Sequence, residues 1–214
     1  MSTDVQPAVL ANKSSAQQAA ALYGAALAAL KLRAYAQASG LATQLAQLAQ
    51  APALVDRLVR LLRADIALAQ EQWSLALASM TAPVRATDAK DMSLERSEML
   101  LLAQAQVHNG EAVRAASSLH VWTVEHPRDH GAWRALGAAY EAQGRDIAAL
   151  RAQAQADSLQ YDASAALGRL RAAQDLVRKG QWGAYGPDHI EASIVDTRAR
   201  EIVQLLREQA NQQR

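Results

Sequence analysis

Histidine is the residue type in this 214-residue chain with the clearest capacity to bind a metal ion. The chain has five histidines, and His120, His126 and His130 lie within eleven residues of one another. A spacing of four would place His126 and His130 on one helix face. However, Pro127 lies between them at a predicted turn between helices, and no carboxylate completes a catalytic zinc set. We therefore expect solvated turn histidines, and neither a metal nor another cofactor in this chain.

Sequence motifs of hydrolases and nucleotide-binding enzymes are also missing. The chain has no His-Glu-x-x-His, no Gly-x-Ser-x-Gly and no glycine-rich loop that ends in Lys-Ser or Lys-Thr. The absence of cysteine excludes a thiolate nucleophile, a disulfide and Cys-ligated zinc. Gly180, Gly183 and Gly186 resemble a spaced-glycine motif, but they follow a predicted helix instead of a strand. We therefore predict that this chain is not an enzyme; an enzyme with an unrecognised site, which would need a deep pocket of convergent ionisable groups, stays an alternative.

Four carboxylates, Asp88, Asp91, Glu95 and Glu98, could be imagined as a general acid/base pair. They lie in a polar loop and in the first turn of a predicted helix that follows Ser93. Negative charge at this position offsets the positive end of the helix dipole. We therefore predict that they cap the helix.

The composition is that of a helical protein. Half of the residues are hydrophobic but only 4% are aromatic. Alanine and leucine are the main apolar residues, and phenylalanine is absent. The net charge of +1 gives no electrostatic surface for nucleic acid or an anionic membrane. No apolar run approaches the roughly 20 residues of a membrane span, and residues 1–13 do not resemble a secretory signal. These features predict a soluble all-α chain, and the sequence does not indicate an oligomeric state.

A 34-residue repeat is the clearest pattern in the sequence. Residues 130–163 carry the large and small residues of a tetratricopeptide unit in register, namely Trp133, Leu136, Gly137, Tyr140, Gly144, Ala149 and Ala156. Bulky side chains fill the space between two helices, and glycine and alanine allow close approach. One period earlier, residues 96–129 match at Leu102, Ala103, Gly110, Ala115 and Pro127. We predict a right-handed tetratricopeptide superhelix of antiparallel helix pairs, in which the tryptophans fill the core.

The remaining sequence divides around these two units. We expect a flexible N-terminus over 1–15, degenerate units over 16–80, a loop and hinge over 81–93 and units over 94–179. A glycine and aromatic loop over 180–187 then precedes a capping helix over 188–208 and a tail over 209–214. The predicted buried stripe of the capping helix comprises Ile190, Ile194, Ile202 and Leu206.

The first helix of each pair lines the concave surface of such a solenoid. The side chains there predict a groove that binds a peptide or a partner protein, although a plain solvated face is the alternative for any one of them. The predicted groove residues are Tyr23, Lys31, Leu100, Gln104, His108, Arg134, Glu141, Gln153 and Asp157.

Residues 94–208 resemble the C-terminal tetratricopeptide region of BepA-like periplasmic zinc metallopeptidases of peptidase family M-48. The resemblance rests on residues 98–105, 125–129, 132–145 and 148–154. It rests most specifically on IEASIVDTRARE at 190–201, which is similar to the Asp-x-Arg-x-Arg ending of that family.

The resemblance implies that this chain is the excised, non-catalytic C-terminal domain of an exported parent, with zinc in a preceding peptidase domain. It also implies a periplasmic location, and the outer-membrane protein assembly machinery and the parent's own peptidase domain as partners. No catalytic or metal residue is carried over, because this chain has no counterpart of the peptidase domain. A free-standing cytoplasmic tetratricopeptide adaptor or chaperone partner is the alternative.

Overall fold

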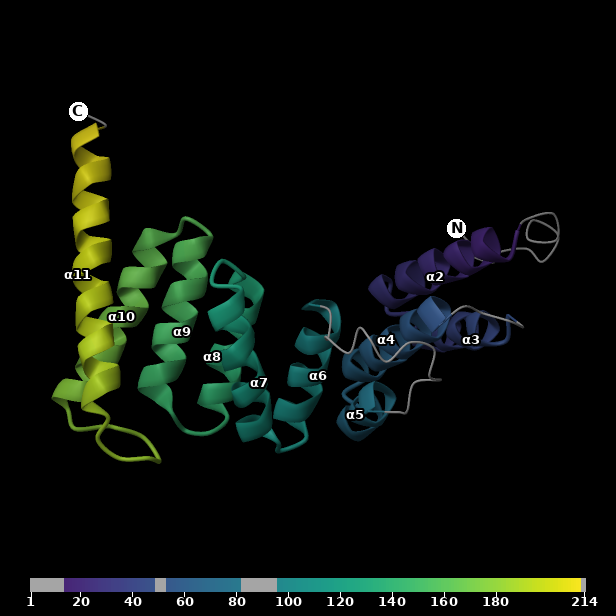
Figure 1. The fold of residues 1–214 in the computed structure, drawn as a ribbon, viewed down its shortest axis with the longest axis horizontal. Helices are drawn as coiled ribbons and strands as arrows, with labels where there is room; N and C mark the ends of the chain where they lie inside the picture. Colours follow the sequence, from purple (N-terminus) through teal and green to yellow (C-terminus); the bar gives the residue numbers. More distant parts are fainter. Residues whose placement is uncertain (1–13, 49–52, 82–95, 213–214) are drawn as a thin grey trace. The chain divides into compact units, whose positions relative to one another are not determined.

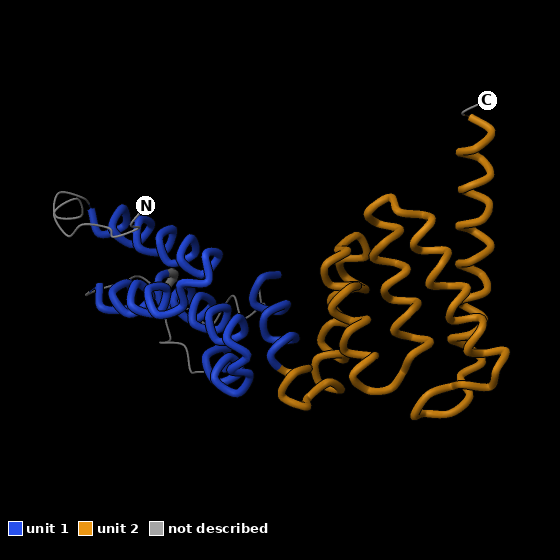
Figure 2. Tube along the Cα trace, turned by 180° about the vertical axis from the view of Figure 1, so that it is seen from behind, with its two compact units in different colours: residues 1–105 blue, residues 106–214 orange. Residues whose placement is uncertain are grey.

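Helices form every regular element that the structure describes. The computed structural model describes residues 14–48, 53–81 and 96–212, and within these ranges all regular structure is helical, with no strand. The described part of the chain also contains no helix that is both long and apolar enough to cross a membrane. The chain forms two compact units, residues 1–105 and residues 106–214 (Figure 2).

The first unit contains two helical hairpins. Helices α2 (Ser15–Lys31) and α3 (Tyr35–Ala46) form one, and helices α4 (Ala53–Ala69) and α5 (Trp73–Thr81) form the other (Figure 1). Ser14 caps α2 reciprocally with Gln17: its Oγ accepts from the Gln17 N–H at 3.4 Å, and its own N–H donates to Gln17 Oε1 at 3.1 Å. Leucines from α2, α3 and α4, including Leu22, Leu45 and Leu62, form the main core.

The boundary between the units falls inside helix α6 (Arg96–His108). Ala105 on α6 is fully buried and clusters with Ala67, Leu68 and Ala76 of α4 and α5. These contacts explain why most of α6 belongs to the first unit. The predicted hinge over 81–93 lies outside the described residues except for Thr81, which is the last residue of α5.

The second unit contains helices α7 (Ala112–Glu125), α8 (His130–Glu141), α9 (Asp146–Leu159), α10 (Ala163–Arg178) and α11 (His189–Gln212). Each of these helices packs against the next one in the chain, so the five stand side by side (Figure 1). Leu136 and Leu170 are almost completely buried between them. The core is otherwise rich in alanine, whose small side chain allows the helices to approach closely.

The helix starts recur at two different spacings. From α6 to α8, and from α7 to α9, the starts are separated by the period of a tetratricopeptide unit. In the first unit the starts of α2 and α4, and those of α3 and α5, are separated by a longer period. The reason is helix length, since α2 and α4 have 17 residues each, whereas α6 has 13 and α8 has 12.

One turn recurs between successive helices. At five junctions the N–H of the residue that follows a left-handed residue donates to the carbonyl five positions earlier, at 2.8 to 3.0 Å, as in a Schellman motif. The same bond ends α10 at Gly180.

The left-handed residue itself differs between the five junctions. It is Gly110 or Gly144 where the tetratricopeptide period holds, but Arg33, Glu71 or Tyr161, with φ of 59°, 58° and 63°, elsewhere. The non-glycine turns carry a conformational cost that glycine would avoid.

Three tryptophans predicted to fill the core are only half-buried, and their N–H or ring faces make specific contacts. The Trp133 indole N–H donates to the carbonyl of Pro127 at 3.0 Å, and that of Trp122 donates to Asp129 Oδ2 at 3.1 Å. Trp182 lies edge-on to His189 with ring centroids 5.4 Å apart. Trp182 packs against the core of the second unit, as predicted. The N–H groups of Trp133 and Trp122 bond to polar partners instead, which keeps part of each ring near the surface.

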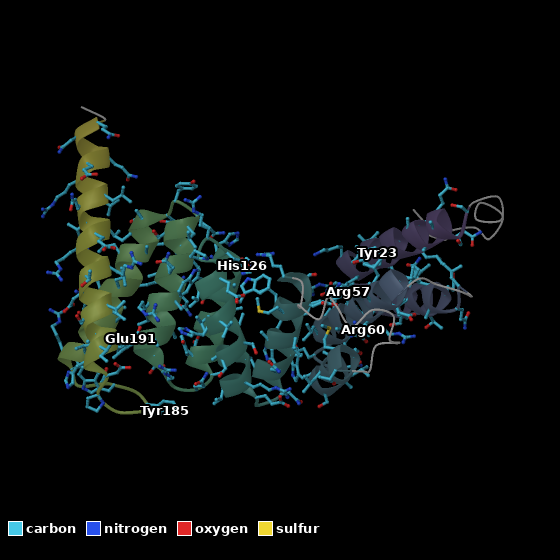
Figure 3. All side chains as sticks on the ribbon, in the orientation of Figure 1. Tyr23, Arg57, Arg60, His126, Tyr185 and Glu191 are labelled. Atoms are coloured by element: carbon cyan, nitrogen blue, oxygen red, sulfur yellow. The ribbon has the colours of Figure 1, made fainter. Side chains whose placement is uncertain are left out.

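Helix α11 is rotated from the predicted stripe. Ile190 is 77% exposed and Ile194 is 38% exposed, whereas Glu191, Val195 and Ala199 are buried. Glu191 lies near the base of the helix (Figure 3), where it accepts from Arg151 of α9. This pairing turns Val195 and Ala199 toward α9 and α10, so the prediction for Ile190 and Ile194 is wrong. Ile202 and Leu206 do pack against the core.

Candidate binding surface

The predicted groove residues are divided between the two units. Tyr23, Lys31, Leu100 and Gln104 belong to the first unit, and His108, Arg134, Glu141, Gln153 and Asp157 belong to the second. Of the latter, His108 is the exposed last residue of α6.

The structure brings four predicted residues of the second unit into one polar network around Asp157. This carboxylate, near the end of α9, is only 6% exposed. Its Oδ2 accepts from Arg169 Nε of α10 at 2.6 Å, and its Oδ1 lies 3.5 Å from Arg134 Nη2 of α8. A buried carboxylate is stable when charged only if it is paired and hydrogen-bonded, and the two guanidinium groups meet that need from both sides of α9.

Gln153 lies one turn earlier on α9 and extends the same network. Its Oε1 accepts from Arg169 Nη1 at 2.8 Å, and its Nε2 donates to Glu141 Oε2 of α8 at 3.4 Å. Arg134 Nη2 also donates to Gln160 Oε1 at 2.8 Å. We call this set the Asp157 network: Arg134, Glu141, Gln153, Asp157, Gln160 and Arg169.

Close packing of α8 on α9 positions the network. Gly137 on α8 faces Gln153, and a Cβ at this glycine would lie 2.8 Å from Gln153 Cγ and 3.3 Å from the Ala149 carbonyl. The missing side chain at Gly137 therefore lets α9 lie close enough to α8 for Gln153 to reach Glu141. Arg134 and Arg169 stay accessible, with 58% and 42% of their side chains exposed. Each arginine keeps N–H donors beyond those that the network uses.

Sequence reasoning missed Arg169. Arg169 lies on the helix after α9, where the repeat pattern had already weakened, and it meets Asp157 across 12 residues of sequence. The residue spacing within one helix gives no signal for such a contact. Only the packing of α10 on α9 reveals it.

In the first unit, Tyr23 of α2 lies near Asp65 of α4, which the sequence prediction did not include. Burial, and secondly the Asp65 carboxylate, raises the pKa of Tyr23 above its usual value. Burial also raises the pKa of Asp65, and the charge of Lys31 opposes that shift only in part. Leu100 is half-buried and Gln104 is exposed on α6. Tyr23 and Lys31 thus both interact electrostatically with Asp65. Among the described residues, these three side chains do not form a chain of hydrogen bonds like that of the Asp157 network.

Glu98 lies in the first turn of α6, as the sequence predicts, but its carboxylate is also buried and paired. It is 4% exposed and accepts from Arg57 Nε at 2.6 Å and from Arg57 Nη2 at 2.5 Å. Arg60 Nη2 lies 3.7 Å away, and both arginines project from α4 (Figure 3). This bidentate pair joins α6 to α4, so Glu98 is a structural residue of the first unit. Asp88, Asp91, Ser93 and Glu95 lie outside the described residues.

The clustered histidines make ordinary surface contacts. The His126 ring stacks on the Trp122 indole with centroids 4.0 Å apart, and His120 and His130 are exposed. Within the described ranges, no three His, Asp or Glu side chains are grouped so that they could hold a metal ion.

The glycine and aromatic loop of 180–187 packs against the turn between α8 and α9. The Ala184 N–H donates to the Gly144 carbonyl at 3.0 Å, and a Cβ at Gly183 would lie 2.2 Å from the same oxygen. Arg145 lies over the rings of both Tyr140 and Tyr185, at 4.5 Å and 5.6 Å from their centroids. Gly183 therefore serves the close packing of two backbone segments.

The fold and the surface define an all-helical protein built from stacked helices, with a polar network across three of them. A comparison with protein-family models gives no match, and a comparison with curated proteins gives no significant match.

Proposed function

We propose that this chain is a non-enzymatic protein–protein interaction module of the tetratricopeptide type, and that it binds a peptide or a partner protein against the Asp157 network. The observation that carries the proposal is the network itself, in which side chains of α8, α9 and α10 form one continuous hydrogen-bonded surface. The spacing of the helix starts from α6 to α9 and the close approach at Gly137 support the repeat type.

The chemistry of the network suits an extended polypeptide. Two arginines are balanced by Asp157 and Glu141, so the surface offers hydrogen-bond donors and acceptors without a large excess of either charge. A peptide backbone needs both kinds of partner. Because Asp157 holds the guanidinium groups in place, binding costs less side-chain entropy than it would with free arginines.

The resemblance of residues 94–208 extends the proposal to the parent protein. We propose that the chain is the non-catalytic C-terminal domain of an M-48 type zinc metallopeptidase that acts in envelope protein quality control in the periplasm. The zinc would belong to the parent's peptidase domain, and the partners would be that domain and the outer-membrane assembly machinery. The coding sequence upstream of Met1 tests this part. A His-Glu-x-x-His motif there would support it, and a natural start codon at Met1 would favour the cytoplasmic adaptor.

A selected peptide tests the binding surface. A phage-displayed random peptide library is panned against the full chain, and the best peptide is measured by fluorescence anisotropy. Replacing Arg134 and Glu141 together by alanine should weaken its binding about tenfold, since both side chains belong to the network. The matched control replaces Arg114 and Glu111, an exposed arginine–glutamate pair on α7, and should leave binding unchanged. Equal binding by both double variants would refute the assignment of the surface.

A further inference from the structure

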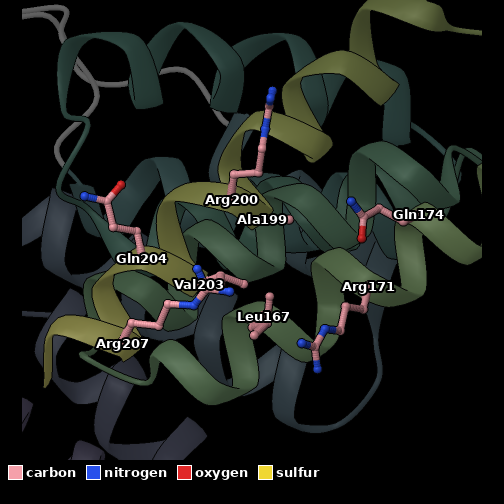
Figure 4. A pocket seen from close by; sticks show the side chains of 8 residues that line it. All are labelled: Leu167, Arg171, Gln174, Ala199, Arg200, Val203, Gln204 and Arg207. Atoms are coloured by element: carbon pink, nitrogen blue, oxygen red, sulfur yellow. The ribbon is translucent and has the colours of Figure 1, made fainter. Parts of the chain in front are cut away.

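A groove lies between α10 and α11, and none of the residues of the Asp157 network lines it. It is a groove of about 490 Å³ whose floor is apolar, made by Leu167, Ala199 and Val203. Three arginines and two amides complete the lining, namely Arg171, Arg200, Arg207, Gln174 and Gln204. In Figure 4 the Arg200 side chain points away from Leu167 and Val203. We call it the α10–α11 groove.

Helix α10 departs from the repeat at one position beside the groove. Arg171 lies one tetratricopeptide period after Gly137, the residue that allows α9 to contact α8 closely. Arg171 is exposed at this position, and its side chain lines the groove. Helix α11 is also longer than its neighbours and continues past the turn between α9 and α10 (Figure 1). Val203 is partly buried against the core and also lines the groove.

The charge around this groove is positive and unbalanced. None of its eight lining residues is acidic. Within the described part of the chain, Arg171 and Arg207 make no hydrogen bond or ion pair, and Arg200 bonds only to the Asp196 carbonyl and Thr197 Oγ1, both at 3.3 Å.

Carboxylates near the groove do not neutralise these arginines. Gln174 donates to Asp196 Oδ1 at 2.7 Å, and Gln204 donates to Glu208 Oε1 at 3.0 Å. Glu201 pairs with Arg198 instead, at 2.8 Å. Three guanidinium groups around an apolar floor thus lack an anionic partner among the described residues.

We infer that the α10–α11 groove binds an acidic peptide segment of a partner protein, with an apolar side chain on the floor and carboxylates on the arginines. Arginine is the preferred partner for carboxylates because its planar group donates two parallel hydrogen bonds. The volume is within the range of small binding pockets and accommodates a few side chains. A nucleic acid would meet the arginines but would not use the apolar floor, and the near-neutral chain gives it no wider basic surface.

This inference is independent of the proposed function, because it uses different residues and predicts a different ligand chemistry. The probe is a fluorescein-labelled octapeptide of alternating glutamate and leucine, measured by fluorescence anisotropy with the full chain. An all-glutamate octapeptide, a lysine and leucine octapeptide and an oligothymidine are the comparison probes. We expect the glutamate and leucine peptide to bind best, more weakly at high salt, and the lysine peptide not to bind.

Charge reversal identifies the surface. Replacing Arg171 and Arg207 by glutamate should weaken the binding of the glutamate and leucine peptide by about tenfold or more. The control replaces Arg114 and Arg128, which are exposed and outside the groove, with the same change in net charge, and should weaken binding less than about twofold. Circular dichroism checks that both variants are folded. If the groove variant is unfolded, Arg171→Gln with Arg207→Gln replaces it and should show a smaller loss of the same sign.

Several outcomes would overturn the inference. The first is that the glutamate and leucine peptide does not bind. The second is that both charge-reversed variants lose the same amount of affinity for it. The third is that the all-glutamate peptide or the oligothymidine binds more tightly than it does. Loss of binding in the Arg134→Ala and Glu141→Ala variant would place the peptide on the Asp157 network instead. Retained binding in that variant, together with loss in the groove variant, separates the two surfaces.

Discussion

Gly137→Ala tests the close contact between α8 and α9, because two effects of known size act in opposite directions. An alanine inside a helix is favoured over glycine by about 1 kcal/mol. At Gly137 the new Cβ would lie 2.8 Å from Gln153 Cγ and 3.3 Å from a backbone carbonyl. Overpacking of this kind costs about 1–3 kcal/mol. The net change in the free energy of unfolding should therefore lie between about zero and a loss of about 2 kcal/mol.

The structure supplies a matched control in the same unit. Gly168 also lies inside a helix, but a Cβ there would have no neighbour within 4 Å. Gly168→Ala should therefore stabilise the protein by up to about 1 kcal/mol. The two variants should differ by roughly 1–3 kcal/mol, which corresponds to several degrees in the thermal midpoint for a chain of this size.

Thermal unfolding followed by far-ultraviolet circular dichroism measures this difference. Gly137→Ala should also weaken peptide binding to the Asp157 network, because Gln153 must move and with it the contacts to Arg169 and Glu141. If Gly137→Ala stabilised the chain as much as Gly168→Ala does, the close packing of α8 on α9 would be refuted.

Three further substitutions have expected outcomes. Arg33→Gly should raise the free energy of unfolding by about 0.5–1 kcal/mol in urea titration, because φ at this turn is 59°. Glu191→Gln should lower it by about 3 kcal/mol, since it breaks a largely buried pair with Arg151, whereas Glu201→Gln in an exposed pair should stay within about 0.5 kcal/mol. Asp65→Asn should stabilise the protein at pH 7. The pKa of Asp65 is raised on folding above its ordinary value of 3.8, so the folded state binds more protons than the unfolded state. The free energy of unfolding therefore falls as the pH rises from 3.8 through the pKa of the folded state. Thermal midpoints at about pH 3 and pH 7 check this, and a gain that persisted at the lower pH would contradict it.

The sequence predicts those parts of the fold in which the type of a residue is enough to determine how it packs. The all-helical class follows from the composition, and Gly137 has the close-approach role that its place in the repeat predicts. The rotation of α11 could not be predicted, because an isoleucine stripe and the observed buried face differ by one residue of register. The pairing of Glu191 with Arg151 across 40 residues decides between them.

The turns show the same limit. Glycine marks the left-handed residue at Gly110 and Gly144, but Arg33, Glu71 and Tyr161 adopt the same conformation. At those three positions the packing of the flanking helices outweighs the local preference. The sequence likewise indicated Arg134 and Glu141 as surface residues of one helix, yet gave no reason to join them to Arg169. Contacts of that range depend on the packing of complete helices.

The two surfaces of the second unit differ in how their arginines are neutralised, and this difference sets what each can bind. Arg134 and Arg169 already contact the carboxylate of Asp157, so an acidic ligand would have to compete with a buried charge that cannot be left unpaired. A neutral backbone can instead use the remaining N–H donors without breaking those pairs. Arg171 and Arg207 have no such carboxylate within the described residues, and an acidic ligand would therefore gain ion pairs without disrupting any. A peptide that carries both an extended neutral stretch and an acidic apolar stretch could engage both surfaces at once, and its affinity should then exceed that of either part alone.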